Sequence, residues 1–171
     1  VLIVERGFGT LSAAFALGMF AQVGVIAHLV TRLVPVVGAI HAAAAVSVAT
    51  AAAVTGRVAL GMLLGHGDRR MIAAGNFAIQ ACGVTLLAVG STAVILASGC
   101  ILFGLGIGSL LSLPPLIAQA EFPQSDVPRV VALVTAVNQA VFAFAPVIFG
   151  FLREVIGGYA TPFRSMIRKR H

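Results

Sequence analysis

The sequence predicts an all-α membrane protein, and three observations lead to that fold class. Of the 171 residues, 60% are hydrophobic and only 9% are charged, whereas a soluble domain carries roughly 25% charged residues. The hydrophobic residues fall into stretches long enough to cross a hydrocarbon core of about 30 Å as helices. They lack the apolar–polar alternation of membrane β-strands, so a helical transmembrane bundle surrounded by the lipid bilayer is expected.

Five spans are expected, joined by short connections. They cover residues 8–31, 36–64, 71–89, 92–118 and 129–152. Arg32 ends the first span, and Pro35 suits the first turn of the second. Pro114 and Pro115 are expected to bend the last turns of the fourth span, before a polar loop at 119–128.

The two ends of the chain differ from the spans. We expect residues 1–7 to form a short cytoplasmic lead-in and residues 160–171 a basic, aberrant or truncated tail. The chain begins at Val1 without Met, and Glu5 precedes a span too long for a signal peptide. The sequence therefore indicates a fragment, whose main part is a partial half-bundle over residues 8–159.

The distribution of arginines predicts the orientation. With the N-terminus in the cytoplasm, the loops on that side hold Arg6, Arg69, Arg70 and Arg129, and the opposite loops hold fewer basic residues outside the tail. Basic residues favour the cytoplasmic side. We therefore expect a multi-pass protein of the plasma (inner) membrane with a cytoplasmic N-terminus.

The net charge of +6 does not indicate nucleic-acid binding. Much of it lies in the last eight residues, and the other basic residues are mostly single ones at the ends of apolar runs. All the carboxylates lie in loops or at span ends, and the hydrolase and metalloprotease motifs are missing. Cys82 and Cys100 are expected to be buried thiols. We thus expect no enzyme, no catalytic residue, no metal and no cofactor.

Arg57 is the most informative residue, because a permanently charged guanidinium inside an apolar span must face a cavity, a partner or the interface. Ser47 and Thr50 share its helical face. This polar stripe predicts an anion-binding or gating arginine. A structural arginine that reaches toward the cytoplasmic boundary is the alternative.

Other polar side chains within spans are candidates for a substrate path. The candidates, together with Arg57, are Gln22, His28, Asn138 and Gln139. Thr135, Asn138 and Gln139 share one face of the fifth span, which favours cavity lining. Interhelical hydrogen bonding is the alternative for such amides, including Asn76 and Gln80 in the third span. His28 can couple to protons or be a satisfied interhelical histidine.

Glycines in the fourth span have a packing role in this interpretation. The run 104–109 superficially resembles a dinucleotide-binding loop, but it follows no strand and lies within a span. Gly104 and Gly108 are four residues apart and form a small-xxx-small face. Such a face lets another helix approach closely.

The second span and the loop after it resemble a signature of the major facilitator superfamily. Gly56–Leu64 followed by Asp68, Arg69 and Arg70 is similar to its pattern G-R-x-x-x-G-x-L-A-D-R-x-G-R-R, with Gly61 at the second glycine of the helical part. The segments Ala16–Gly24, Gly104–Phe122 and Val127–Tyr159 fit the same register. The resemblance implies helices seven to eleven of a twelve-helix carrier, loosely of the monocarboxylate-porter-like branch.

The chain departs from this signature in its loop. Gly65 replaces the acidic residue, His66 replaces the basic residue that follows, and Asp68 stands at a glycine position. In the family the acidic residue helps to hold the cytoplasmic gate, so its replacement bears on gating, with Asp68 as a partial substitute. The resemblance also implies an N-terminal transporter half as a partner, because the path lies between two halves.

The leading functional hypothesis is transport of a small organic solute, an organic anion being one candidate, by a secondary carrier with alternating access. In this hypothesis the chain is an incomplete carrier. A truncated, non-transporting membrane protein or assembly partner is the first alternative. A channel subunit is a weaker alternative, because the sequence has neither rings of acidic residues nor a carbonyl filter.

Overall fold

The computed structural model describes residues 6–63, 68–110 and 112–157. Its elements are the helices α1 (Arg6–Leu63), α2 (Arg69–Val89), α3 (Ala93–Ile107), α4 (Leu113–Glu121) and α5 (Val127–Gly157). In the described part, all regular secondary structure is therefore helical, which confirms the predicted all-α class. The expected lead-in at 1–7 overlaps the start of α1, and the expected tail at 160–171 lies outside the described residues.

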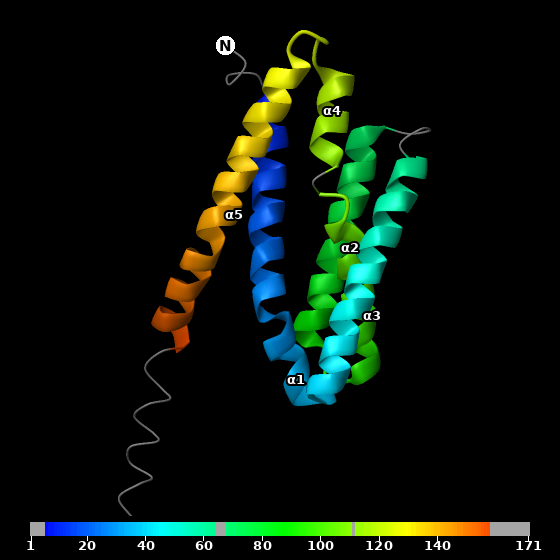
Figure 1. Cartoon of the computed structure of the whole chain (residues 1–171), viewed down its shortest axis with the longest axis vertical. Coiled ribbons are helices and arrows are strands. Elements are labelled where there is room, and N and C mark those ends of the chain that lie inside the picture. The colour runs from blue at the N-terminus through cyan, green and yellow to red at the C-terminus, as the bar shows by residue number, and fades with distance from the viewer. Residues whose placement is uncertain (1–5, 64–67, 111, 158–171) are drawn as a thin grey trace, which may run out of the picture.

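Helix α1 consists of two arms that meet at Gly38, the first arm covering residues 6–37 and the second arm residues 39–63. Gly38 has φ 79° and ψ 165°, a conformation open almost only to glycine. The arms run in opposite directions (Figure 1). The break expected between Arg32 and Pro35 was therefore placed too early. Pro35 lies within the helix, because losing one N–H weakens a helix without providing the positive φ that this reversal uses.

The predicted fourth span is divided into α3 and α4. Helix α3 ends at Ile107 and α4 begins at Leu113, with a proline in its first turn. The expectation that Pro114 and Pro115 bend the last turns of one helix was wrong. The first N–H groups of a helix have no partner within it, so prolines fit a helix start better than a helix interior.

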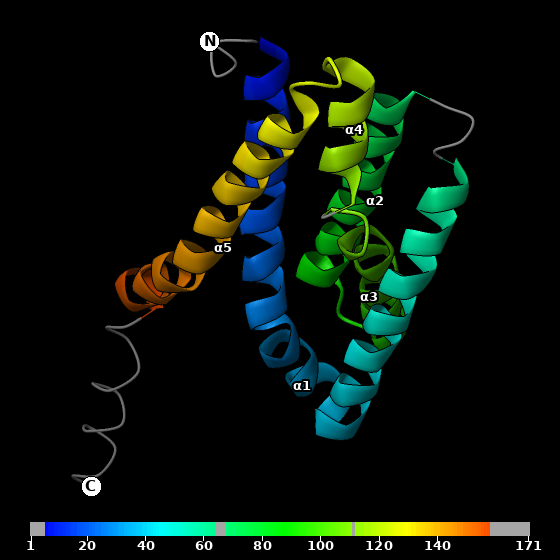
Figure 2. The same ribbon diagram turned by 45° about the horizontal axis from the view of Figure 1, so that its top comes forward.

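The helices form a bundle in which the two arms of α1 open from Gly38 and α2 to α4 stand between them (Figure 2). Helix α3 packs against α1 and α2, and α5 packs along α1. Phe149 of α5 stacks on Phe20 of the first arm with ring centroids 4.8 Å apart. Phe149 also fills the space left by Gly24, where a Cβ atom would lie 2.2 Å from the ring.

Two apolar clusters hold the bundle together. One joins α1, α2, α4 and α5 near the start of α1, around Phe8, Phe15 and Val134. The other joins both arms of α1 to α2 and α3 near Gly38, around Leu33, Leu96 and Phe103. Because these clusters lie at opposite ends of the bundle, each end of the fold has its own packed core.

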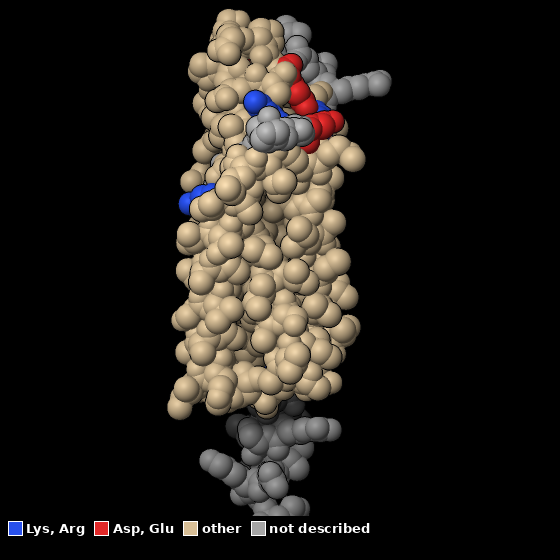
Figure 3. Space-filling model, turned by 90° about the vertical axis from the view of Figure 1, so that its right-hand side faces the viewer, with Lys and Arg blue, Asp and Glu red and all other residues tan. Residues whose placement is uncertain are grey.

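Large apolar side chains also cover the outer surface. Ile40 is 84% exposed and Val94 is 76% exposed, and on the face in Figure 3 the charged side chains gather near one end. Among the residues that the structure describes, three helices, α1, α2 and α5, are long and apolar enough to cross a membrane. The chain therefore has the surface and helix lengths of a membrane protein, as predicted.

Candidate functional site

The candidate site is centred on the helix interruption, the non-helical stretch between Ile107, where α3 ends, and Leu113, where α4 begins. The C=O of Gly106 in the last turn of α3 accepts hydrogen bonds from two buried amides of α2, Gln80 Nε2 at 3.1 Å and Asn76 Nδ2 at 3.4 Å. Ser109 N also donates to this oxygen, at 3.3 Å. Carbonyls at a helix end have no partner within the helix. Two side chains from a neighbouring helix therefore add to the backbone N–H of Ser109 at an oxygen that lies where the helical pattern of backbone bonds stops.

Arg57 of the second arm supports the same interruption from the other side. Its Nε donates to the C=O of Gly108, the C-cap of α3, over 2.9 Å. A guanidinium near a helix C-terminus is also favoured by the helix dipole. The side chain is otherwise exposed, and its terminal nitrogens have no hydrogen-bond partner among the described residues. Arg57 thus combines a capping role with free donors.

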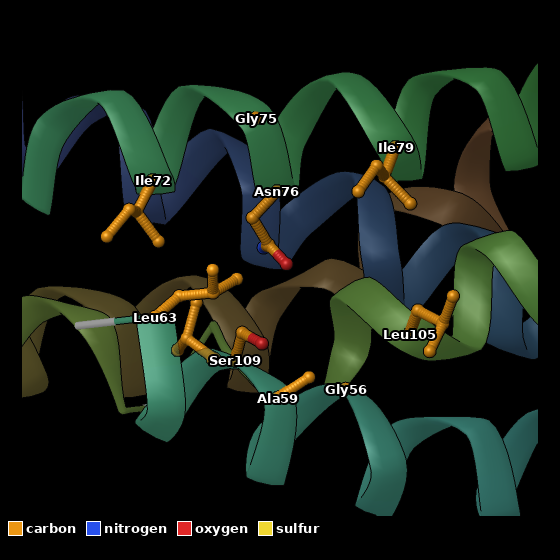
Figure 4. A pocket seen from close by; sticks show the side chains of 10 residues that line it. Gly56, Ala59, Leu63, Ile72, Gly75, Asn76, Ile79, Leu105 and Ser109 are labelled. Carbon is orange, nitrogen blue, oxygen red and sulfur yellow. The ribbon is translucent and has the colours of Figure 1, made fainter. Parts of the chain in front are cut away.

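A cavity of about 280 Å³ lies beside the interruption, between the second arm of α1, α2 and α3. Figure 4 shows the Asn76 amide and the Ser109 hydroxyl reaching into it from opposite walls. Both side chains are buried, and apolar residues such as Leu60 and Ile72 form the rest of the lining. A few polar groups in an apolar pocket are typical of small-molecule sites.

Three glycine contacts bring the walls of the site close together. A Cβ atom on Gly56 would lie 2.0 Å from the Leu105 oxygen, and one on Gly104 would lie 2.4 Å from the Ala49 oxygen. On Gly108 it would lie 2.2 Å from the Ala53 oxygen. The structure therefore places Gly104 and Gly108 where α3 meets the second arm, with backbones in direct contact.

The residues of the signature loop tie the start of α2 to α4. Asp68 is the N-cap of α2 and accepts a hydrogen bond from Arg70 N at 2.8 Å. Arg70 forms a two-pronged ion pair with Glu121, with Nη2 and Oε2 2.7 Å apart. Arg69 donates to the C=O of Leu116. Gly65 and His66 lie outside the described residues.

The two glycines of the helical part of the signature differ in their surroundings. Gly56 is buried against α3, whereas Gly61 is exposed and a Cβ atom on it would meet nothing within 4 Å. Of these two glycines, Gly56 is the one that close packing against α3 requires.

The predicted path residues do not share one cavity in the described structure. Gln22 lines a cavity of about 380 Å³ between the first arm and α2, away from Arg57. His28 is exposed and lines a separate cavity of about 200 Å³. Of the polar residues expected to converge on α5, Asn138 is buried, whereas Thr135 and Gln139 are exposed. Neighbours on one helix face can fall on either side of a contact line, so the cavity-lining role expected for this face stays a prediction.

Two buried amides in the path set have an unpaired atom. Gln22 Nε2 and Asn138 Oδ1 are buried and have no hydrogen-bond partner among the described residues. A buried polar atom without a partner costs about 1–3 kcal/mol. Such atoms mark positions where a ligand, water or another protein segment would be stabilising.

Sequence reasoning missed the role of Arg32, which it placed only at the end of a span. Arg32 Nη2 donates to the C=O of Gly90, the C-cap of α2, over 2.5 Å. Cys82, expected to be buried, is exposed, whereas Cys100 is buried. Both differences depend on which helices are neighbours, which the linear order of apolar residues does not give.

Comparisons with known proteins leave the family open. No protein-family model, no curated protein and no solved structure matches the chain. The resemblance to the major facilitator superfamily therefore stays a prediction based on the residues of the second span and its loop.

Proposed function

We propose that the chain is part of a secondary carrier that moves a small organic solute across a membrane by alternating access. In this proposal it supplies one half-bundle, corresponding to helices seven to eleven of a major facilitator superfamily carrier, and works with an N-terminal transporter half. The solute is an organic anion, because the charged group next to the candidate site is Arg57.

The interruption between α3 and α4 is the observation that supports transport most strongly. Non-helical backbone at membrane depth is tolerated where it is buried in protein or lines a cavity. Interrupted helices of this kind form substrate and ion sites in many carriers. Here the carbonyls of Gly106 and Gly108 bond to side chains of two other helices, beside a cavity that contains the polar groups of Asn76 and Ser109.

The exposed polar groups on two helices support a second bundle. On the second arm, the hydroxyls of Ser47 and Thr50 donate to carbonyls of their own helix, so Arg57 is the group of that stripe that most needs a polar neighbour. On α5, Gln139 is exposed among apolar residues. Lipid does not solvate such groups, whereas a facing half-bundle or a water-filled path would.

The proposed orientation places the end of the bundle with the signature loop in the cytoplasm, in the plasma (inner) membrane. Arg69, Arg70 and Arg129 all start helices at this end. At the opposite end, the described arginines are Arg32 and Arg153. This difference agrees with the enrichment of basic residues in cytoplasmic loops.

The test uses the 171-residue chain in lipid nanodiscs with radiolabelled pyruvate as the anionic probe and radiolabelled glucose as a neutral one. We expect saturable binding of pyruvate and no saturable binding of glucose. Arg57→Gln should weaken pyruvate binding at least about tenfold, since hydrogen bonds to charged groups contribute about 1.5–3 kcal/mol. Arg57→Lys should keep part of the affinity.

Arg32→Gln is the matched control, because Arg32 also donates to the C-cap carbonyl of a helix but lies at the other end of the bundle. It should bind pyruvate like the unchanged chain. Equal losses in the two glutamine variants would contradict an anion site at Arg57. A folded chain that binds neither probe would instead favour a non-transporting membrane protein or assembly partner.

A further inference from the structure

A groove with basic side chains at one end lies between the first arm of α1 and α2, apart from the site at the helix interruption. It contains a cavity of about 200 Å³, lined by His28 and Arg32 on the first arm and by Val84, Leu87 and Ala88 on α2. Helices α1 and α2 touch each other far less than each touches α3. His28 and Ala88 are exposed, so the groove is open to the surroundings of the bundle.

Arg32 has donors left over after its bonds to the protein. Its Nη2 donates to the C=O of Gly90 at 2.5 Å and to the C=O of Ala88 at 3.3 Å. Its Nε and Nη1 have no partner among the described residues. Neither nitrogen is among the buried unpaired atoms of those residues, so both are accessible in this half-buried side chain. The fork of N–H groups of a guanidinium is suited to the oxygens of a phosphate.

The groove has basic groups and no acidic ones. His28 lies one turn before Arg32 on the same helical face and adds an imidazole N–H donor. No acidic side chain lines the cavity among the described residues, and the carboxylates of Asp68 and Glu121 lie at the other end of the bundle. A cationic group in a ligand would find no counter-charge here. The groove therefore favours a ligand whose only charge is negative.

The basic end of the groove lies at the depth of lipid headgroups. The first arm covers residues 6–37, so Arg32 is about 16 Å along the helix from the middle of the arm, at a rise of about 1.5 Å per residue. The hydrocarbon core has a half-thickness of about 15 Å. Helix α2 ends at the same level, because its C-cap Gly90 provides the acceptor for Arg32. The free nitrogens therefore lie where the phosphates of a bilayer begin.

Apolar side chains continue the groove toward the middle of the bilayer. Val25 and Leu29 line it on the first arm, and Val84 and Leu87 line it on α2. Val25 lies roughly 10 Å deeper than Arg32 along the helix. An acyl chain extends from the phosphate of a lipid toward the bilayer centre. A lipid with its phosphate at Arg32 would thus place an acyl chain against these apolar side chains.

We propose that this groove binds an anionic phospholipid such as phosphatidylglycerol. Its phosphate accepts hydrogen bonds from the free N–H groups of Arg32 beside His28, and one acyl chain lies between the first arm and α2. The lipid fills space between two segments that have few direct contacts with each other. This site does not depend on the proposed transport function, because it uses neither Arg57 nor the cavity at the helix interruption.

Photoreactive lipids test the proposal at the level of the groove. Phosphatidylcholine nanodiscs would hold the 171-residue chain and a small fraction of phosphatidylglycerol with a diazirine in one acyl chain, and the labelled peptides would be mapped by mass spectrometry. We expect saturable labelling of the peptides that cover residues 25–29 and 84–87. A phosphatidylcholine probe with the same acyl chains should label them about fivefold less, since its choline offsets the phosphate charge that Arg32 attracts.

Three variants assign the preference to Arg32. Arg32→Gln removes the charge and keeps an amide donor for the C=O of Gly90, so it should lower phosphatidylglycerol labelling of the groove to the phosphatidylcholine level. Arg32→Lys keeps the charge and should keep most of the preference. Arg69→Gln is the matched control, because Arg69 also donates to a helix carbonyl, that of Leu116, but lies at the other end of the bundle. It should label like the unchanged chain.

Far-UV circular dichroism and a single elution peak would verify that each variant folds. Equal labelling of the groove by the two probes in the unchanged chain would overturn the proposal. A preference for phosphatidylglycerol that survives in Arg32→Gln, or that is lost equally in Arg69→Gln, would also overturn it, since the preference would then come from the overall charge. If Arg32→Gln does not fold, the comparison of the two probes in the unchanged chain decides.

Discussion

The two glycines of the signature segment should respond in opposite ways to the same substitution. Gly56 and Gly61 both lie on the second arm of α1. A Cβ atom on Gly56 would lie 2.0 Å from the Leu105 oxygen, whereas one on Gly61 would meet nothing within 4 Å. Gly56→Ala and Gly61→Ala therefore form a matched pair that isolates the contact between α1 and α3.

The expected magnitudes follow from two opposing contributions. Alanine in place of glycine within a helix stabilises it by about 0.5–1 kcal/mol, and for Gly61→Ala this is the whole effect. In Gly56→Ala the new methyl group forces α3 away by about an ångström in a close-packed interface. Overpacking of this kind costs about 1–3 kcal/mol. We expect the free energies of unfolding of the two variants to differ by roughly 2 kcal/mol.

Unfolding by increasing fractions of sodium dodecyl sulfate in a mild detergent, followed by circular dichroism, would measure these free energies. A double variant that also changes Gly104 to Ala should lose less than the sum of the single effects, because one separation of α1 and α3 relieves both contacts. Equal unfolding midpoints for Gly56→Ala and Gly61→Ala would refute the close approach of these two helices.

The remaining predictions concern polar contacts. The side chains of the Arg70–Glu121 ion pair are 49% and 28% exposed. Because exposed ion pairs contribute little, a double-mutant cycle should give a coupling free energy of only about 0.2–1 kcal/mol. A coupling above about 2 kcal/mol would mean that the pair is buried in the membrane protein. Asn76→Leu and Gln80→Leu should each destabilise by about 0.6–2 kcal/mol, and together by less than the sum because they share one acceptor; strict additivity would speak against the shared carbonyl. Asn138→Leu should leave the unfolding free energy unchanged or raise it, because the Oδ1 that it removes is unpaired; a clear loss of stability would reveal a partner for that atom.

The helical class followed directly from composition and segment length, but the positions of the helix ends did not. The expected break near Pro35 and the observed reversal at Gly38 differ because proline only weakens a helix, whereas this reversal uses a positive φ. Similarly, Pro114 begins a helix instead of bending one. A proline in the sequence is compatible with a helix that ends or bends there and with a helix that begins or continues there. Tertiary packing decided between these possibilities at each position.

The candidate site was partly visible in the sequence. Arg57 was identified as a charged residue in an apolar span, and Gly104 and Gly108 as a small-residue face. The partners were not visible, because Gly108 lies on another helix from Arg57, and Gly106 on another helix from Asn76 and Gln80. The expected grouping of Gln22 and His28 with Arg57 in one path stays a prediction: in the described structure Gln22 and His28 line separate cavities.

By itself, then, the sequence determined that the segments suit a lipid environment and that they are helical. Transfer of a segment into lipid depends on the summed hydrophobicity of its consecutive residues. It also depends on hydrogen bonding of the backbone within the segment, which a helix provides. The tertiary structure decided where the helices break and which side chains satisfy the carbonyls at the break. Those choices depend on contacts between residues far apart in the chain, as the bond from Arg57 to Gly108 shows.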